Sequence, residues 1–293
     1  MDIANSIRFF GALSLLALGV LLRPNALVAA PILAVAIMWP TRFSWKRAAI
    51  LCVPIGVAMF ALVQVVYYGA LNAKREHPLQ SIMVFDLGGI SHFTEQNQFP
   101  VAWSAAETAL LTKGCYQPTD WDIYWTRDPC KFVMARLEHD KLFGSPAVAD
   151  AWERAVLNHP IAYLQHRTAF MWNFLAHANL TVWTIDVYDP SKTVFADRPA
   201  FNALATVDAA LKPTPLLRAG TWLIICIAVC ALAWRRRDTP SGALALGVCG
   251  SAAVYVLTFF AVGVASDFRY AYWAVLASIV GAVATAVDGS KPR

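Results

Sequence analysis

Several apolar runs in this chain approach or reach the roughly 20 residues that an α-helix needs to cross the hydrocarbon core of a bilayer. The clearest runs are residues 48–71, 219–234, 242–265 and 270–287. Hydrophobic residues make up 58% of the 293 residues and charged residues only 15%, which is far from the balance of a soluble domain. We therefore expect a polytopic membrane protein made of α-helices.

The N-terminal region offers two shorter apolar runs, 9–22 and 25–39, separated only by Arg23 and Pro24. We interpret them as two short or tilted spans, with one span plus a re-entrant or interfacial piece as the alternative. The fold class expected is an all-α membrane helix bundle of about six spans with a mostly helical extracytoplasmic domain in one long loop. The expected divisions are a membrane region of three spans at 1–71, the outer domain at 72–215 and a second three-span membrane region at 216–293.

Basic residues in short loops predict the orientation of these spans. They form four groups, namely Arg8; Arg42, Lys46 and Arg47; Arg235, Arg236 and Arg237; and Lys291 and Arg293. With six spans all four groups fall on one side, which the positive-inside rule makes cytoplasmic. We expect the inner membrane, both termini in the cytoplasm and residues 72–215 outside. Because membrane anchoring accounts for much of the net charge of +5, we expect no nucleic-acid partner.

Helix starts are visible in the outer segment. Ser145-Pro146 and His159-Pro160 each place proline at the first position of an expected helix. The second helix mixes aromatic residues with Gln165, His166 and Arg167, a composition that suits the membrane surface. A seventh span there is the competing interpretation, but these polar groups would be costly in hydrocarbon.

Two of the six cysteines, Cys115 and Cys130, lie in the outer segment, where an oxidising exterior would allow a disulfide. The sequence leaves this pairing open, because it does not give the Cα separation that a bridge requires. The other four cysteines fall in expected spans, where a thiol is usually a small apolar packing group. No zinc-binding spacing is present.

Charged residues at the outer ends of spans are costly unless they face a polar cavity. Arg23, Asp267 and Arg269 are therefore candidates for function, although an arginine at a helix end often only reaches toward lipid headgroups. The predicted topology brings Arg23 and Arg269 to one face of the membrane. Two guanidinium groups suit a phosphate or pyrophosphate, which each can bind in a bidentate manner.

The "LLRPNALVAAPIL" and "DFRYAYWAVLA" segments, together with the short spans and the helix-rich outer loop, resemble the GT-C superfamily of polytopic glycosyltransferases, which includes the protein mannosyltransferases. The resemblance is to the C-terminal portion of such enzymes. It implies a sugar donor on a polyprenyl phosphate, an acceptor on the outer face, lipid-phosphate binding by Arg23 and Arg269, and Tyr270 beside them. Asp267 would orient Arg269 through a charge-assisted hydrogen bond.

Members of that superfamily usually carry the catalytic carboxylate in a large loop after the first span, whereas here that loop is only the Arg-Pro turn. We expect either the C-terminal portion of a longer enzyme or a shortened relative that is inactive alone. The catalytic residue is thus unknown, and Asp86, Asp120 and Asp122 are weak candidates. Asp120 and Asp122 flank Trp121, a mixture suited to a sugar, and Asp86 precedes a Gly-Gly pair that we interpret as a turn close to a ligand. A solvated loop carboxylate or a helix cap is the ordinary alternative for each.

Two functions of different classes follow. The first is a membrane glycosyltransferase, or its C-terminal portion, whose partners are membrane lipid, a polyprenyl-linked sugar donor and an unknown acceptor. The second is a non-catalytic scaffold or assembly subunit whose outer domain binds a partner. The sequence requires no cofactor; a metal cluster of Asp86, His92 and Glu95 matches no defensible spacing, so a divalent metal is unsupported and no metal ligands are predicted. A secondary transporter is weaker, since no inverted repeat is visible.

Overall fold

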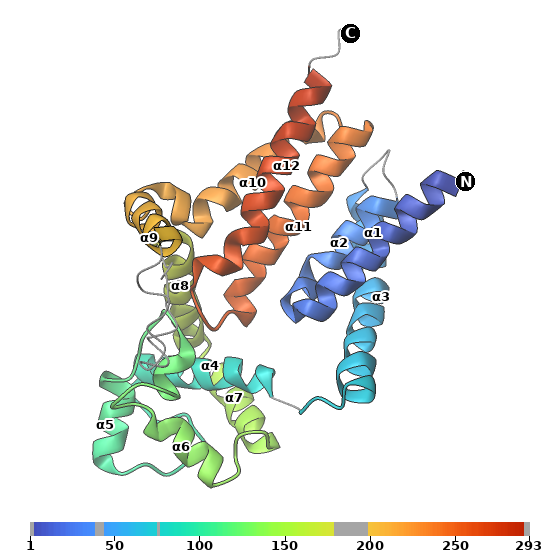
Figure 1. Cartoon of the computed structure of the whole chain (residues 1–293). Coiled ribbons are helices and arrows are strands. Elements are labelled where there is room, and N and C mark those ends of the chain that lie inside the picture. The colour runs from blue at the N-terminus through green and yellow to red at the C-terminus, as the bar shows by residue number, and fades with distance from the viewer. Residues whose placement is uncertain (1–2, 39–43, 75–76, 179–198, 290–293) are drawn as a thin grey trace. The chain divides into compact units, whose positions relative to one another are not determined.

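The computed structural model describes residues 3–38, 44–74, 77–178 and 199–289 (Figure 1). Over these residues the regular elements are helices, and the only pairing of extended backbone is an isolated bridge between Asp120 and Ala265. The chain divides into two compact units. The first is Met1–Arg75, Thr221–Thr258 and Ala271–Arg293, and the second is Glu76–Gly220 and Phe259–Tyr270.

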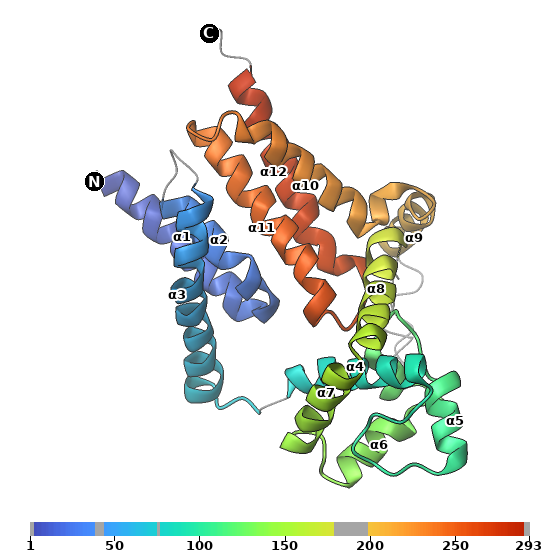
Figure 2. The same cartoon turned by 180° about the vertical axis from the view of Figure 1, so that it is seen from behind.

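The first unit contains most of the apolar helices. They are α1 (Ile3–Leu22), a 3₁₀ helix (Pro24–Val28), α2 (Ala30–Met38), α3 (Trp45–Gln64) with a π-helical continuation (Val65–Ala70), α10 (Ala219–Trp234), α11 (Pro240–Val262) and α12 (Tyr272–Gly289). Val20, Ala30 and Val63 form a buried cluster that joins α1, α2 and α3. In both views α10, α11 and α12 lie side by side (Figures 1 and 2).

Three helices among the described residues are long and apolar enough to cross a membrane. They are Lys46–Ala70, Pro240–Val262 and Phe268–Val287, close to three of the predicted spans. Phe9–Leu22 and Ala219–Trp234 are apolar but shorter. The predicted span 25–39 is not one helix, because the chain passes through a 3₁₀ helix before the nine-residue α2, which is too short to cross a bilayer. Both interpretations of this region, like the total of six spans, stay predictions.

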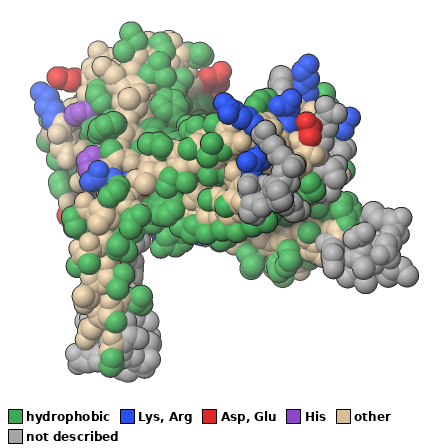
Figure 3. Space-filling model, turned by 90° about the horizontal axis from the view of Figure 1, so that it is seen from above, with side chains coloured by type: hydrophobic (Ala, Val, Ile, Leu, Met, Phe, Trp, Pro, Cys, Tyr) green, Lys and Arg blue, Asp and Glu red, His purple; other side chains and the backbone are tan. Residues whose placement is uncertain are grey.

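The predicted orientation also stays a prediction. Of the basic residues that carry it, Arg42, Lys291 and Arg293 lie outside the described residues. The helix surfaces of the first unit are those of a lipid-facing bundle. Large apolar side chains are highly exposed there, for example Ile50 at 73% and Leu15 at 70%. The space-filling view shows hydrophobic side chains over much of the visible surface and Lys and Arg in a few groups (Figure 3).

Small residues allow α11 and α12 to approach closely. Ala245, Cys249 and Ala252 of α11 and Ala274 and Ala277 of α12 are fully buried. A Cβ added at Gly281 would overlap the Cys249 thiol, so the glycine leaves room for its neighbour. Trp273 Nε1 donates to Ser251 Oγ at 3.1 Å across the same pair. Close backbone approach with a few interhelical hydrogen bonds is how helices associate in lipid, where the hydrophobic effect does not drive them together.

The second unit is a helical assembly around α4. Its elements are α4 (Pro78–Thr94), α5 (Ala105–Lys113), a 3₁₀ helix (Trp121–Tyr124), α6 (Phe132–His139), α7 (Pro146–Asn158), α8 (Pro160–Ala176), α9 (Pro199–Leu211), a 3₁₀ turn (Pro215–Leu217) and the 3₁₀ helix Phe268–Ala271, whose last residue falls in the first unit. Every residue of α4 from 84 to 91 is buried. Since a helix buried all round must be covered on several sides, α4 packs against α5, α7 and α8 (Figure 1).

Local signals set the helix starts. Ser145 caps α7 by accepting a hydrogen bond from the Ala147 backbone at 3.3 Å, with Pro146 at the first position, and α8 begins at Pro160 as predicted. Ser104 and Glu107 form a capping box at α5. One local interpretation is wrong: Gly88 and Gly89 lie inside α4 rather than in a turn. Their role is to admit neighbours, because a Cβ at Gly88 would overlap Tyr124 and one at Gly89 would overlap His166.

Replacing Gly89 with alanine should therefore destabilise the chain although alanine is the better helix former. The new methyl group would force the buried His166 ring to move, and overpacking of this kind costs about 1–3 kcal/mol. The thermal unfolding midpoint of the detergent-solubilised chain measures the effect. Gly250→Ala is the matched control, because its Cβ would meet nothing within 4 Å; equal midpoints for the two variants would contradict the packing role.

Candidate functional site

Two segments far apart in sequence meet through their backbones in the second unit. Trp121 N donates to Val264 O at 3.0 Å, and Ser266 N donates to Thr119 O at 2.7 Å. These bonds flank the isolated bridge between Asp120 and Ala265. They join the loop before the Trp121–Tyr124 helix to the connection between α11 and the last span. These hydrogen bonds therefore bring predicted site residues from the two segments close together in the fold.

Asp120 has more side-chain partners than Asp122, a second carboxylate where these two segments meet. Its Oδ1 lies 3.3 Å from Arg127 Nη2, and its Oδ2 accepts a hydrogen bond from Thr119 Oγ1 at 3.0 Å. The Asp120 side chain is 17% exposed, and that of Arg127 is 49% exposed. Arg127 is a member of the site that sequence reasoning missed, since only its proximity to Asp120 distinguishes it from other loop arginines.

Asp122 is exposed at the surface beside this pair. Partial desolvation and the neighbouring Asp120 carboxylate raise the pKa of Asp122, while Arg127 and Arg269 oppose the shift. A carboxylate whose pKa lies above its ordinary value is a stronger base once ionised. The opposing effect of Arg269 indicates that it lies near the Asp122 carboxylate.

Arg269 itself is held by its own loop. Its Nε lies 3.1 Å from Asp267 Oδ2, and its backbone N–H donates to Asp267 Oδ1 at 2.8 Å. The guanidinium carbon lies 5.2 Å from the centroid of the Tyr270 ring. Asp267 and Tyr270 thus contact Arg269 from two sides, yet 54% of the Arg269 side chain stays exposed. An anionic ligand could reach it without rearrangement of the backbone.

Two tryptophans border the carboxylates. Trp121 and Trp125 meet edge to face with ring centroids 5.1 Å apart, and Trp125 is 44% exposed. Aromatic faces beside carboxylates and arginines can hold a polar ring compound through its apolar faces while the charged groups bind its hydroxyls.

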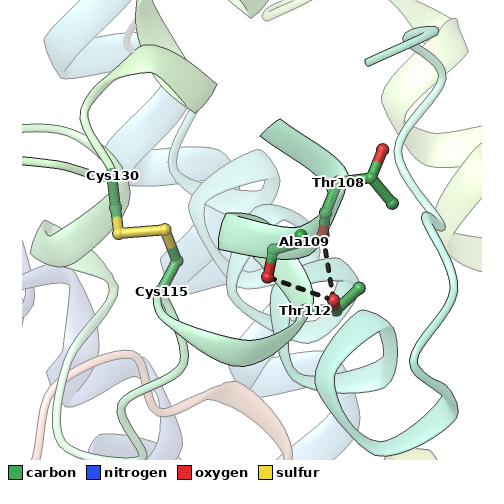
Figure 4. Close-up of a disulfide and its surroundings, with 5 residues drawn as sticks. All are labelled: Thr108, Ala109, Thr112, Cys115 and Cys130. Carbon is green, nitrogen blue, oxygen red and sulfur yellow. Dashed lines mark hydrogen bonds between the residues drawn. A yellow bond between two sulfur atoms is a disulfide. The ribbon is translucent and has the colours of Figure 1, made fainter. Parts of the chain in front are cut away.

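A disulfide closes this loop. Cys115 and Cys130 are bonded, with their Cα atoms 5.5 Å apart (Figure 4). Cys115 follows α5, where Thr112 Oγ1 donates to Thr108 O at 2.9 Å. Both cysteines are fully buried. The bridge limits the freedom of the loop that carries Asp120, Asp122 and the tryptophans, and so helps to hold them in place.

Asp86, the third candidate carboxylate, lies elsewhere. It is fully buried in α4, with Oδ1 at 2.6 Å from Arg167 Nε and Oδ2 accepting from Trp152 Nε1 at 2.7 Å. Burial raises the pKa of Asp86, and Arg167 and Trp152 oppose the shift. Because Asp86 is fully buried and both its oxygens have partners, it offers no surface to a substrate.

Arg167 links this core to the surface site. It is fully buried in α8, its guanidinium carbon lies 5.9 Å from the ring centroids of Phe85 and Tyr163, and its Nη1 donates to Gly263 O at 2.6 Å. Gly263 begins the connection that carries Asp267 and Arg269. The sequence singled out Arg167 only as a costly group for a span, so its role as the partner of Asp86 was missed.

His166 packs between Gly89 and Tyr116. Its Nδ1 lies 3.3 Å from the Tyr116 hydroxyl, and its Nε2 lies 3.5 Å from Asp86 Oδ1. Burial, together with Arg167 and His92, lowers the pKa of His166 to about 3. The imidazole is therefore neutral at physiological pH and acts as a packing group of the core. His166 and Arg167 face α4, and the prediction that their helix lies at the membrane surface stays a prediction.

The remaining predicted residue, Arg23, belongs to the first unit. It is exposed and caps the 3₁₀ helix Pro24–Val28 with extended backbone (φ −144°, ψ 90°). Its pairing with Arg269 stays a prediction. Within the described residues no group of three His, Cys, Asp or Glu side chains could hold a metal ion. The chain matches no protein family model, no curated protein and no solved structure.

The neutral state of His166 predicts an acid-dependent loss of stability. An unfolded histidine titrates near 6.5 and the folded one near 3, so the unfolded state binds more protons between these values. Stability should fall as the pH drops below about 6.5, by about 2 kcal/mol at pH 5. Chemical unfolding at pH 8, 6.5 and 5 measures this slope. His166→Gln should flatten it, whereas an unchanged slope in the variant would contradict the assignment.

Replacing only one partner of the Asp86–Arg167 pair should lower the free energy of unfolding more than replacing both partners. Arg167→Met leaves a buried carboxylate without its partner and should lower the free energy of unfolding by about 3–5 kcal/mol. The double variant Asp86→Asn/Arg167→Met keeps an acceptor for Trp152 and should lose less than the sum of the single changes. Additive losses in this double-mutant cycle would show that the two side chains do not act as a pair.

Proposed function

We propose that this protein is a membrane glycosyltransferase, or the C-terminal portion of one, that transfers a sugar from a polyprenyl-phosphate-linked donor to an acceptor on the extracytoplasmic face. The observation that carries the proposal is the meeting of Asp120 and Asp122 with Asp267, Arg269 and Tyr270 in one site. Such a site combines a base with a group that binds phosphate.

The position of Arg269 along the chain supports a lipid-linked donor. Arg269 lies at the start of the candidate span Phe268–Val287, and the preceding connection follows the candidate span Pro240–Val262. A loop between two spans lies near the membrane surface, where the phosphate of a polyprenyl lipid also lies. Arg269 would bind that phosphate, Asp267 would orient the guanidinium, and Tyr270 would cover one side of it.

Asp122 suits the base better than Asp120 does. Asp120 is already engaged by Arg127 and Thr119, whereas Asp122 is exposed and its pKa is raised. As a general base Asp122 would take the proton of an acceptor hydroxyl while the sugar leaves its phosphate. Trp121 and Trp125 would hold the sugar or the acceptor beside the carboxylate.

The second candidate is a non-catalytic scaffold, favoured by the exposed Trp125 on the disulfide-closed loop. Exposed aromatic residues on a rigid loop are common anchors of protein interfaces. This function would not need Arg269 or the carboxyl group of Asp122, which is how the two candidates can be separated.

Farnesyl phosphate, a soluble analogue of the donor lipid, tests the phosphate role through tryptophan fluorescence. Arg269→Gln should weaken its binding about tenfold, as expected for loss of one charge-assisted contact. Asp122→Asn should leave binding intact and lower transfer from a panel of polyprenyl-phosphate-linked hexoses about 100-fold or more. Arg23→Gln tests the predicted second arginine separately.

The matched control is Arg154→Gln, an exposed arginine of α7 outside the site. It should leave both binding and transfer unchanged, and farnesol should bind no differently to wild type and Arg269→Gln. If Arg269→Gln and Asp122→Asn both bound farnesyl phosphate and transferred sugar as well as the wild type does, the transferase function would be refuted and the scaffold function favoured.

A further inference from the structure

A pocket of about 530 Å³ opens in the first unit between α10 and α12. Its walls are apolar, with Val229 and Leu232 from α10 and Ala282 and Ala286 from α12. Arg235 and Arg236, which follow α10, also line it. The proposed glycosyl-transfer site belongs to the second unit and uses none of these residues.

The composition of the pocket is that of a site for an amphiphile. The apolar walls offer burial to a hydrocarbon chain, and the two guanidinium groups offer hydrogen bonds to an anionic head. No acidic residue is among the described residues that line it. Inorganic phosphate would fill little of a 530 Å³ cavity and would leave its apolar walls unused. The lining therefore suits a ligand that carries a hydrocarbon chain better than it suits a free anion.

One of the two arginines is already positioned at the pocket. Arg236 Nη1 donates to Thr285 O of α12 at 3.2 Å, so its side chain extends from the end of α10 across to α12. Arg236 and Arg235 are both exposed, as a headgroup site at a membrane surface requires. Leu232, 63% exposed, extends the apolar wall outward to where the acyl chains of the bilayer would lie.

Arg237, the third arginine of the same run, is directed elsewhere. Its guanidinium carbon lies 5.2 Å from the centroid of the Trp234 ring, and its Nη1 donates to Trp234 O at 3.2 Å. It does not line the pocket. The run thus divides into two residues that face the pocket and one that does not, which a general attraction to anionic membranes would not require.

We propose that this pocket is a binding site for an anionic phospholipid, whose phosphate contacts Arg235 and Arg236 and whose acyl chain lies along Val229, Leu232, Ala282 and Ala286. Basic pockets between membrane helices are suited to such headgroups. The proposal does not depend on the glycosyltransferase function, and its test uses different residues and a different lipid.

Native mass spectrometry of the full chain, with phosphatidylglycerol or phosphatidylcholine added to the detergent, tests the proposal. Wild type should retain one phosphatidylglycerol per chain in preference to phosphatidylcholine. The double variant Arg235→Gln/Arg236→Gln should bind phosphatidylglycerol about 30-fold more weakly. Each of the two arginines is expected to contribute about fivefold to the affinity for an anionic lipid. Arg235→Lys/Arg236→Lys should restore most of the binding, which separates lost charge from lost folding.

Arg237→Gln is the matched control, since it removes the same charge from the same run, and it should change binding less than about twofold. Ala286→Leu fills the apolar part of the pocket while keeping both arginines, and it should also weaken phosphatidylglycerol binding. Equal losses in Arg237→Gln and the double variant, or no preference for phosphatidylglycerol, would overturn the proposal. So would full binding by Ala286→Leu, or competition by inorganic phosphate at equal concentration, since either would indicate an anion contact without a lipid pocket.

Discussion

The buried ion pair between Asp86 and Arg167 is the interaction on which the second unit depends. Taking two ions out of water is costly, and hydrogen bonds to their remaining polar atoms offset part of that cost. Trp152 satisfies the second carboxylate oxygen, and the Gly263 carbonyl accepts from the guanidinium. The pair therefore joins α4, α7 and α8 and fixes the start of the connection that carries Arg269. A core interaction sets the position of a surface group.

Local signals in the sequence were sufficient for the starts of two helices but not for this pair. Pro146 and Pro160 predicted the starts of α7 and α8 because a helix start is decided by adjacent residues. Asp86 and Arg167 are far apart in sequence, and nothing near either residue identifies its partner. Gly88 and Gly89 were misinterpreted for the same reason: a glycine pair suggests a turn, whereas here it makes room for Tyr124 and His166 from distant segments.

The candidate site shows the same division between local and long-range information. Charge at the end of an apolar run identified Asp267 and Arg269, and carboxylates beside a tryptophan identified Asp120 and Asp122. Their meeting depends on backbone hydrogen bonds between segments that no local pattern links. Cys115 and Cys130 are an intermediate case, because the sequence proposed the pair and only the structure supplies the 5.5 Å between their Cα atoms.

Exposure separates the charges that hold the fold from those available to a ligand. The Asp86–Arg167 pair is fully buried, so exchanging either partner for a ligand would leave an unpaired ion in the core. The Asp267–Arg269 pair is 29% and 54% exposed, and pairs of that kind contribute about 0–1 kcal/mol. Asp267 contacts the guanidinium only at Nε, so the other N–H groups of the 54% exposed Arg269 side chain can bind a phosphate at little cost to the fold. The buried pair keeps the connection in place while the Arg269 guanidinium remains open to solvent, a combination that suits reversible binding of a charged ligand.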